Sequence, residues 1–479
     1  MSIFGTLEIG RSALRAQHKG METSGQNVAN ANTPGYSRQR VDLESSVPGI
    51  APGVDMAPGR GVEVSDVTRL KNEYFHQQMM DAGSQRAHWE KRQENITSLE
   101  NIMREPGDQG LNQYMGEFFD SWNELSSEPE ENAIRQSLLE HAETLTNAFE
   151  DNYRRMEDLQ GEVYSEIEMY VDDINEVAEE VAELNEKLTY LHNVGRESNE
   201  LRDHLEHILE DLSEKIDLDI HYQEGGAATV YAGNRLLVHG DQVQEFSVEQ
   251  VNNAEEGNQE EGDLMQIVSD RGRPVEVASG EIKGMLEAAN EIIPNVQEGL
   301  NDMARAMAEE INGIHENAYG LDGETGRPFF QELDEDSDLP PALQLEVNPA
   351  VRDDPDAVAA SSTEEGVPGA GDAALNISKV RDEGIITGGE NDEGEGATLE
   401  DHYRGIVSAL GVEGRESERM VDAMKQAEEE FREQNESVAG VNIDEEMLDM
   451  MQFQHAWHGA SRFLNHVDQM IETLFMELG

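Results

Sequence analysis

Two pairs of histidines are the first candidates for chemistry, because each pair is spaced by about one turn of a helix. The pairs are His204 with His207 and His455 with His458. Histidines three residues apart on a helix can ligate a metal ion together. The sequence contains no HExxH motif and no third ligand at a supporting spacing. We therefore interpret both pairs as histidines of packed or solvated helix faces. A secreted metal-dependent hydrolase stays as an alternative, which metal analysis of the purified protein would test.

The other catalytic patterns are weaker. The chain has no cysteine, which excludes disulfides, thiolate nucleophiles and cysteine-ligated zinc. Gly369 and Gly371 follow no strand pattern and lack the rest of a dinucleotide-binding fingerprint. Carboxylates occur throughout, so that no pair stands out as general acid and base. The sequence predicts that the protein is not an enzyme, with no catalytic, cofactor-binding or metal-binding residue and no cofactor.

The charge of the chain excludes two classes of partner. Its 479 residues include 102 acidic and 34 basic side chains, which gives a net charge of −68. A nucleic-acid-binding protein needs a basic surface, and an anionic membrane would repel this chain. The first 90 residues, with 9 basic and 10 acidic side chains, are almost neutral. We expect this part to be shielded or to meet a partner, whereas the acidic remainder forms a solvated surface that suits salty surroundings.

The two ends of the chain have strong helical patterns. Residues 3–30 and 443–478 place apolar side chains at steps of three and four, the spacing of a coiled-coil seam. Neither helix can bury its seam alone, and burial of each large apolar side chain contributes about 1.5–3 kcal/mol. We therefore predict that these helices pack on each other or on neighbouring subunits. The predicted assembly interface consists of Ile3, Leu7, Leu14, Met21, Val28, Met450, Phe453, Trp457, Leu464, Val467, Ile471 and Leu474.

Between the ends, the pattern predicts an α+β chain of roughly three domains. Long helical stretches are broken at residues 105–107 and 128–129, and one of them has an apolar stripe at residues 174–191. A period of two between glycine turns is typical of a β-rich module. The predicted boundaries are 1–40 and 440–479 for the terminal helices, 41–214 with 280–320 and 400–439 for a mainly helical body, 215–279 for a small β-rich module, and 321–399 for an acidic loop-rich region.

An ordered string near the N-terminus has the most specific pattern. Residues 24–39 end a helix with polar asparagines, a proline that stops it and a glycine turn. The string resembles the N-terminal signature of flagellar axial proteins, the family of rod, hook and hook-associated proteins. Ser37, Arg38 and Gln39 resemble the version in the hook-associated protein 1 (FlgK) family. The matching positions are Asn27, Ala29, Asn30, Asn32, Thr33, Pro34, Gly35 and Tyr36.

A second string matches near the C-terminus. Residues 436–454 resemble the C-terminal signature of the same family, in which an LDEEM-type start leads into a QFQQAY-type helix. Polar caps and a group of acidic residues suit the first turn of such a helix. The matching positions are Asn442 and Asp444, both candidate N-caps, with Glu445 and Glu446. The positions that depart from the pattern are His455, Trp457 and His458.

The middle of the chain agrees with this family. Residues 200–209 are similar to its LRDxRDxLL stretch, with Leu205 and Glu206 departing from it. Residues 279–286 are similar to its SGxLxG stretch, and residues 315–330 to its GxDxxxGxxFF stretch. The resemblance implies an elongated, multi-domain α+β fold. In it, the terminal helices pair into a coiled-coil-like inner axial layer, a helical body surrounds them, and the β-rich module lies outside.

The resemblance also implies a function. It indicates a structural subunit of the bacterial flagellum that joins the hook to the filament. The implied partners are the flagellar hook protein, the second hook-associated (junction) protein, a cytoplasmic export chaperone and copies of the chain itself in a helical lattice, with no nucleic acid and no membrane. The implied location is the extracellular flagellum. No segment has the ~20 apolar residues of a membrane span, and residues 1–31 lack the apolar core of a secretory signal. We therefore expect export by the flagellar export apparatus without a cleaved signal peptide.

Two further alternatives stay open. Another axial protein, such as the hook or distal rod protein, would share the N-terminal string, but the string at residues 441–446 argues against it. A free coiled-coil adhesin would not need a seam at both ends together with the Asn-Thr-Pro-Gly turn at residues 32–35.

Overall fold

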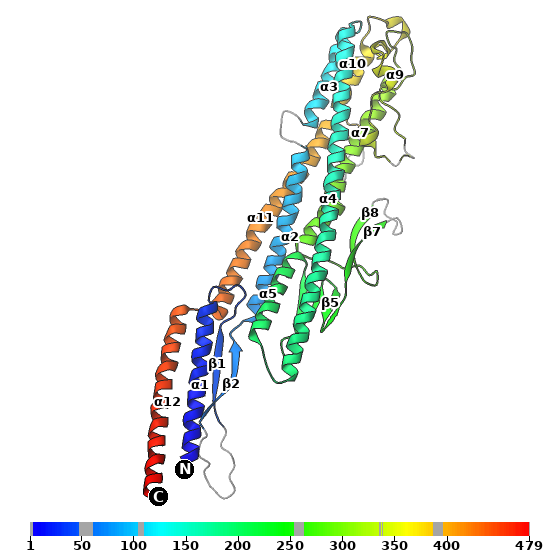
Figure 1. Cartoon of the computed structure of the whole chain (residues 1–479). Helices are drawn as coiled ribbons and strands as arrows, with labels where there is room; N and C mark the ends of the chain where they lie inside the picture. The colour runs from blue at the N-terminus through cyan, green and yellow to red at the C-terminus, as the bar shows by residue number, and fades with distance from the viewer. Residues whose placement is uncertain are drawn as a thin grey trace. The chain divides into compact units, whose positions relative to one another are not determined.

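The computed structural model of the chain is shown in Figure 1. It describes residues 3–46, 61–103, 110–252, 263–334, 337, 339–386 and 396–478. The chain divides into two compact units, and each is assembled from segments that are far apart in the sequence. Unit 1 consists of Met1–Gln85, Ile174–Gln244 and Ala423–Gly479, and unit 2 consists of Arg86–Asp173 and Glu245–Asp422. The long helices α2, α4 and α11 contribute residues to both units.

Unit 1 contains both ends of the chain, a β-hairpin and a four-stranded sheet. Its elements are α1 (Ile3–Asn30), β1 (Gln39–Ser45), β2 (Val62–Arg69), the start of α2 (Glu73–Met103), the end of α4 (Asn132–Asn193), α5 (Asn199–Lys215), β3 (Leu218–Tyr222), β4 (Ala228–Ala232), β5 (Arg235–His239), β6 (Gln242–Val243), the end of α11 (Leu399–Ala439) and α12 (Ile443–Leu478).

Unit 2 is mainly helical, and its described residues include the antiparallel strand pair β7–β8. Besides the remaining parts of α2, α4 and α11, its elements are α3 (Leu111–Ser127), β7 (Phe246–Asn252), β8 (Asp263–Ser269), α6 (Glu281–Glu287), the π-helical turn η1 (Ala288–Ile292), α7 (Ile293–His315), α8 (Pro341–Gln344), α9 (Pro349–Arg352), α10 (Asp372–Lys379) and the 3₁₀ turns η2 (Pro355–Ala357), η3 (Glu364–Gly366) and η4 (Val380–Asp382).

The described strands form antiparallel sheets with local connections. β1 pairs with β2, β7 pairs with β8, and β3 to β6 follow one another in sequence order. Asn185 of α4 attaches the four-stranded sheet to its helix. Its Nδ2 donates to the carbonyl oxygen of Ala228 at 2.8 Å, and its Oδ1 accepts the Ala228 N–H at 2.7 Å. This fully buried side chain therefore stabilises the sheet through backbone groups that the strands do not pair themselves.

The two terminal helices of unit 1 lie side by side and run antiparallel (Figure 1). Glycines of α1 allow large side chains of α12 to approach closely. A Cβ atom added to Gly10 would lie 2.6 Å from Cγ of Leu464, and one added to Gly20 would lie 2.6 Å from the ring of Phe453. Distances this short are not tolerated by real Cβ atoms, so the absence of a side chain at both glycines fixes the spacing of the pair.

The core of unit 2 is a large apolar cluster. Trp122, Phe118 and Phe329 are fully buried in it, and their rings pack edge to face or tilted with centroids 5.1–6.3 Å apart. Aromatic pairs in such geometry are worth about 0.5–1.5 kcal/mol beyond the area they bury. The helix α7 packs a continuous apolar stripe into the same cluster.

Most predicted elements are confirmed. The predicted end helices correspond to α1 and α12, the break at residues 128–129 lies between α3 and α4, and the apolar stripe at residues 174–191 faces the interior. The predicted break at residues 105–107 lies outside the described residues. Strands of the predicted module at 215–279 are found in two sheets, with β3 to β6 in unit 1 and β7 with β8 in unit 2. The domain boundaries themselves stay a prediction.

Candidate functional site

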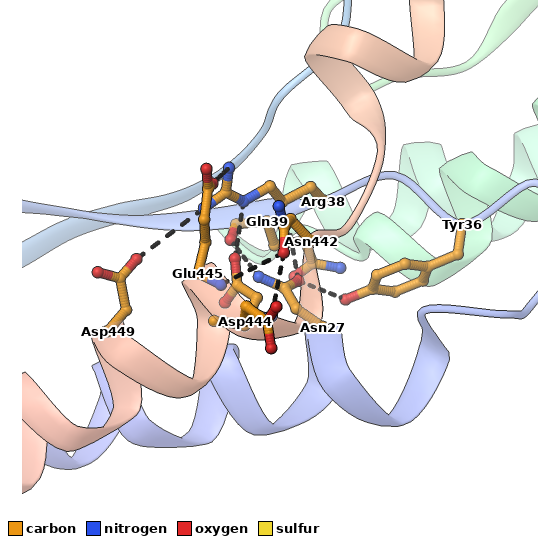
Figure 2. A network of polar contacts seen from close by, with 9 residues as sticks. Asn27, Tyr36, Arg38, Gln39, Asn442, Asp444, Glu445 and Asp449 are labelled. Atoms are coloured by element: carbon orange, nitrogen blue, oxygen red, sulfur yellow. Dashed lines mark hydrogen bonds and ion pairs between the residues drawn. The ribbon is translucent and has the colours of Figure 1, made fainter. Parts of the chain in front are cut away.

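The two signature strings meet in one polar cluster of unit 1, although Arg38 and Glu446 are 408 residues apart in the sequence. Figure 2 shows this cluster. Its members come from the end of α1, the segment that leads into β1, and the start of α12. We call it the terminal joint, and it consists of Asn27, Tyr36, Arg38, Gln39, Asn442, Glu445, Glu446 and Asp449.

Asn27 closes the turn that follows α1. Its Nδ2 donates to the carbonyl oxygen of Gln39 at 2.8 Å, and its Oδ1 accepts the N–H of Gln39 at 3.0 Å. The same Oδ1 accepts a hydrogen bond from the hydroxyl of Tyr36 at 2.9 Å. Asn27 is 1% exposed, so these bonds satisfy a buried amide. The amide group offers a donor and an acceptor side by side, which matches the carbonyl oxygen and the N–H of Gln39. Gly35 has a φ of +73°, which allows the chain to turn back toward Asn27.

Arg38 connects this turn to α12. Its Nε donates to Oε1 of Glu446 at 2.7 Å, its Nη1 donates to Oε2 of Glu445 at 3.3 Å, and its Nη2 lies 3.9 Å from Oδ2 of Asp449. The side chain of Glu446 is only 3% exposed, whereas Arg38 is 22% exposed. The planar guanidinium therefore reaches three carboxylates on the first two turns of one helix, a geometry that an ammonium group cannot reproduce.

The start of α12 has the cap that the sequence predicts. Oδ1 of Asn442 accepts the N–H of Asp444 at 3.0 Å and that of Glu445 at 3.4 Å. Asn442 is therefore the N-cap, and Asp444 belongs to the first turn of the helix. Carboxylates in this turn interact favourably with the positive end of the helix dipole.

A second buried cluster of charges continues from the joint to α5. The N–H of Ser37 donates to Asp203 Oδ2 at 3.4 Å, and Arg69 of β2 binds Asp203 at 2.7 Å and Glu206 at 2.5 Å. Lys71 binds Glu206 at 2.8 Å. Burial alone would raise the pKa of Glu206, but Lys71 and Arg69 outweigh it and lower that pKa. These four side chains are 9–13% exposed, so the cluster is a set of compensated buried charges.

Tyr36 is held as a hydrogen-bond donor. Burial, together with the negative charges of Asp203 and Glu446, raises the pKa of its hydroxyl to about 12. The phenol therefore stays protonated at neutral pH and continues to donate to Asn27.

The remaining signature residues have local roles or face solvent. Asn30 donates to the carbonyl oxygen of Gln26, and Thr33 closes a turn on Asn30. Ala29, Asn32 and Pro34 are exposed. Only part of the N-terminal string therefore enters the terminal joint.

The predicted seam residues are brought together along the α1–α12 pair to different degrees. Val467 is 1% exposed, and Leu474 is 42% exposed. The side chain of Ile3 lies outside the described residues. The half-buried members of the seam are Leu7, Leu14, Met21, Val28, Met450, Phe453, Trp457, Leu464 and Ile471.

Further apolar side chains of α12 are exposed and were not part of the predicted seam. Their exposed fractions range from 42% for Ile443 and Phe463 to 81% for Met476. They lie on both flanks of the face that contacts α1, because they follow one another at helical spacing outside the buried stripe. These side chains are Ile443, Met447, Leu448, Met451, Phe463, Met470 and Met476.

The histidine pairs show no sign of a shared ligand. His204 lies 3.4 Å from Glu180, and His207 lies 3.8 Å from Asp211, so each has a separate carboxylate neighbour. His455 and His458 are exposed on α12. In the part of the chain that the structure describes, no group of three or more histidine, aspartate or glutamate side chains could hold a metal ion. No described helix is long and apolar enough to cross a membrane.

Sequence reasoning missed the partners of Arg38 and the charge cluster on α5. Glu206 was noted only as a departure from the family pattern, yet it binds two cations. A signal was present, because Arg69 and Lys71 are two basic residues in a short segment of a very acidic chain. The partner itself could not be inferred, since it lies more than 130 residues away.

Family models match the two regions that build the joint. Residues 7–36 match the model of the flagella basal body rod protein, and residues 433–475 match the C-terminal model of the flagellar basal body rod FlgEFG protein. The terminal joint is thus formed by regions typical of flagellar axial proteins. Residues 96–330 match the helical domain of the flagellar hook-associated protein FlgK. The chain belongs to the FlgK family of flagellar hook-associated proteins.

Relatives and a solved structure agree with this family. Flagellar hook-associated protein 1 of Bacillus subtilis is 25% identical over 508 residues, which cover 100% of this chain and 99% of the relative. The protein of the same name from Salmonella typhimurium is 25% identical over 326 residues, which cover 67% of this chain and 58% of the relative. The flagellar hook junction protein FlgK from Burkholderia pseudomallei has a TM-score of 0.59 at 13% identity, covering 76% of this chain and 100% of that structure. That match shows a similar α+β fold.

Proposed function

We propose that this chain is the structural subunit that joins the flagellar hook to the filament. The family gives it a hook-associated structural role. The observation that supports the finer proposal is the apolar surface of α12. A helix with apolar side chains on several sides is normally buried, and exposed patches of this kind mark interaction sites. In α12, contact with α1 buries one side of the helix and leaves both flanks exposed.

The α1–α12 pair is, in this proposal, the inner axial layer of an elongated, multi-domain subunit. In this proposal, Leu464 and Ile471 close the pair within one chain. Leu464 lies against Gly10 of α1, and Ile471 is half-buried about two turns further along α12, which supports this assignment. Phe463, Met470 and Leu474 then contact the neighbouring subunit. Contacts of this heterologous type continue along a tube without closing on themselves, which is what a junction between two helical lattices needs.

The remaining parts of the proposal concern partners and location. The partners are the hook protein on one side, the second hook-associated protein on the other, copies of this chain, and an export chaperone before secretion. The subunit acts outside the cell, reaches that location through the flagellar export apparatus, and has no enzymatic activity. The β-rich strands of residues 215–279 are proposed to lie toward the outside of the assembly.

The proposal is tested by placing charges on the exposed flank of α12. Leu448 and Met470 are 55% and 56% exposed in the single chain, so L448D with M470D should leave the circular dichroism and melting of the purified protein unchanged. In a strain that lacks the gene, the double variant should support no filaments, and flagellin should appear in the medium. Electron microscopy and an assay of secreted flagellin measure this.

The matched control is Q454D with Q469D, which adds the same charge at exposed polar positions of the same helix. This control should restore filaments. If the Leu448 and Met470 variant also restores full-length filaments, the exposed surface of α12 is not an assembly surface and the proposed role of the C-terminal helix is wrong.

A further inference from the structure

The terminal helix pair has a band that contains no acidic residue. The chain has 102 acidic residues among 479, yet residues 9–21 of α1 and 450–467 of α12 include no aspartate or glutamate. Gly10 in the first segment lies against Leu464 in the second, so the two acid-free segments run side by side. They carry four arginine or lysine residues and four of the 14 histidines. This band is therefore a local exception in a chain of net charge −68.

On α12, the band forms a stripe that faces away from α1. Arg462 lies two residues before Leu464, which places the two side chains roughly 200° apart around the helix. Leu464 packs against Gly10 of α1, so Arg462 lies on the opposite side of α12, where it is exposed. Three exposed histidines share this side at helical spacing. We call this surface the basic stripe, and it consists of His455, His458, Arg462 and His466.

The β1–β2 pair lies on the other side of α1 from α12 (Figure 1). The hydroxyl of Ser12 accepts the N–H of Val62 at 3.3 Å, and Ser12 follows Gly10 by two residues, which is again roughly 200° around a helix. At the other end of the strands, Gln39 binds Asn27. The strands therefore run along much of the stretch of α1 that the acid-free segment of α12 covers, but on the opposite side.

Four carboxylates line the outer face of this strand pair. Asp42 and Asp66 are Cα partners across the two strands, and so are Glu44 and Glu63. The valines at the alternate positions are half-buried, which leaves the carboxylates on the outer face. Like charges directly opposite each other destabilise a strand pair. Arg40 pairs with Asp42 at 3.1 Å, whereas Glu44 and Glu63 are exposed and have no cationic partner within the described residues. We call Asp42, Glu44, Glu63 and Asp66 the acidic face.

We propose that the basic stripe of one copy binds the acidic face of a second copy of the chain. The two surfaces have opposite charge and lie at the same level on opposite sides of α1, so each copy can bind one neighbour through each surface. This is a heterologous contact, which continues from copy to copy. Arg462 and the histidine N–H groups donate to the carboxylates, and the contact offsets the repulsion between Glu44 and Glu63. The inference rests on the proposed function and adds to it a side-by-side contact between copies.

Charge inversion tests this contact in the full chain. H458E with R462E places carboxylates against the acidic face, and E44K with E63K places ammonium groups against the basic stripe. All four positions are exposed, so the circular dichroism and melting of each purified double variant should equal those of the parent. In a strain that lacks the gene, each double variant should lower the number of filaments per cell by about tenfold or more, because like charges then face each other across the contact.

The quadruple variant that combines both changes separates a contact between copies from one within the chain. Every contact between copies then has inverted but opposite charges, so filaments should return. Within one chain α1 separates the two surfaces, so the inverted charges cannot pair there. The matched control is R415E with R419E, which inverts two exposed arginines one turn apart on α11 and should leave the number of filaments unchanged.

Three results would overturn the contact. The first is a parental number of filaments in either double variant, and the second is a quadruple variant that does not restore them. The third is a lowered melting temperature in a double variant, since the surface would then act within the chain. The failure of the proposed function itself is recognised separately, because L448D with M470D tests the junction role at other residues of α12.

Discussion

The helices α7 and α12 have similar hydrophobic patterns but differ in how much of the apolar surface is buried within the chain. Both repeat apolar residues at steps of three and four. In α7 the stripe is buried within the chain, with Leu300, Met303 and Met307 at 0% exposure. In α12 only Val467 of the apolar side chains with described surroundings is that deeply buried, while Met470 is 56% exposed. The hydrophobic period therefore predicts that a helix will find a partner, but not whether the partner lies in the same chain.

The difference follows from the number of elements packed around each helix. The apolar cluster of unit 2 surrounds α7 with residues of α3, α4, α10 and α11. α12 packs along α1 and contacts the turn at Arg38, and nothing else in the described part of unit 1 covers its flanks to a comparable extent. We interpret the uncovered flanks as the surface that a lattice of subunits would cover.

The largest expected effect concerns the buried apolar stripe of α7. Leu300→Ala should destabilise unit 2 by about 2–5 kcal/mol, because it leaves a cavity in a close-packed cluster. Met470→Ala in α12 should change the free energy of unfolding by less than about 0.5 kcal/mol, because the side chain is already exposed. Urea denaturation of the two purified variants measures both. A loss of similar size for Met470→Ala would show that the flank of α12 is covered within the chain.

A pH-dependent effect of intermediate size is expected at the end of α7. His315 is fully buried, its Nδ1 donates to the carbonyl oxygen of Arg327 at 2.7 Å, and its Nε2 accepts the N–H of Ala359 at 2.8 Å. Protonation of Nε2 would place an N–H against the N–H of Ala359 and so remove this hydrogen bond. Burial lowers the pKa of His315 from 6.5 to about 4. The unfolded chain therefore binds more protons between pH 4 and 6.5.

The contribution of neutral His315 to the stability of unit 2 should accordingly be fully present above about pH 6.5, and it should be lost as the pH falls toward 4. The loss should be a few kcal/mol at most, since one pKa unit corresponds to about 1.4 kcal/mol. Melting curves between pH 4 and 7 measure it, with His315→Gln as the control that removes the titrating group. If the parent and the control have the same slope in this range, His315 does not contribute to the pH dependence.

The sequence predicted the helices better than their contacts. The ends of α1 and α12 follow from local signals, namely the hydrophobic period, Pro34 after the first helix and the cap Asn442 before the last. The two signature strings contain the residues that contact each other in the terminal joint, although neither string indicates that contact by itself. The roles of Arg38 and Glu446 could not be predicted, because their pairing depends on how two segments at opposite ends of the chain come together.

The division of the strands was missed for a related reason. A period of two indicates strands, but it does not state which strands share a sheet. β6 and β7 follow each other closely in the sequence, yet they belong to different sheets. Similarly, Asn185 is a polar residue within the apolar stripe at residues 174–191, and its role in holding β4 depends on a sheet that the local pattern of α4 does not contain.

The smallest expected effect concerns the one side of α12 that is covered within the chain. Gly10→Ala and Gly20→Ala would place methyl groups against Leu464 and Phe453, and overpacking of this kind costs roughly 1–3 kcal/mol. Alanine is otherwise the better helix former by up to about 1 kcal/mol, so the intrinsic effect has the opposite sign. Amide hydrogen exchange of α12 should become faster in the double variant, because the helix pair opens more often. Gly5 and Gly25 of the same helix have open space at the Cβ position, so Gly5→Ala with Gly25→Ala is the matched control and should slow exchange or leave it unchanged. Equal exchange in both double variants would show that α1 does not hold α12 in the single chain, and α12 would then depend entirely on neighbouring subunits for its burial.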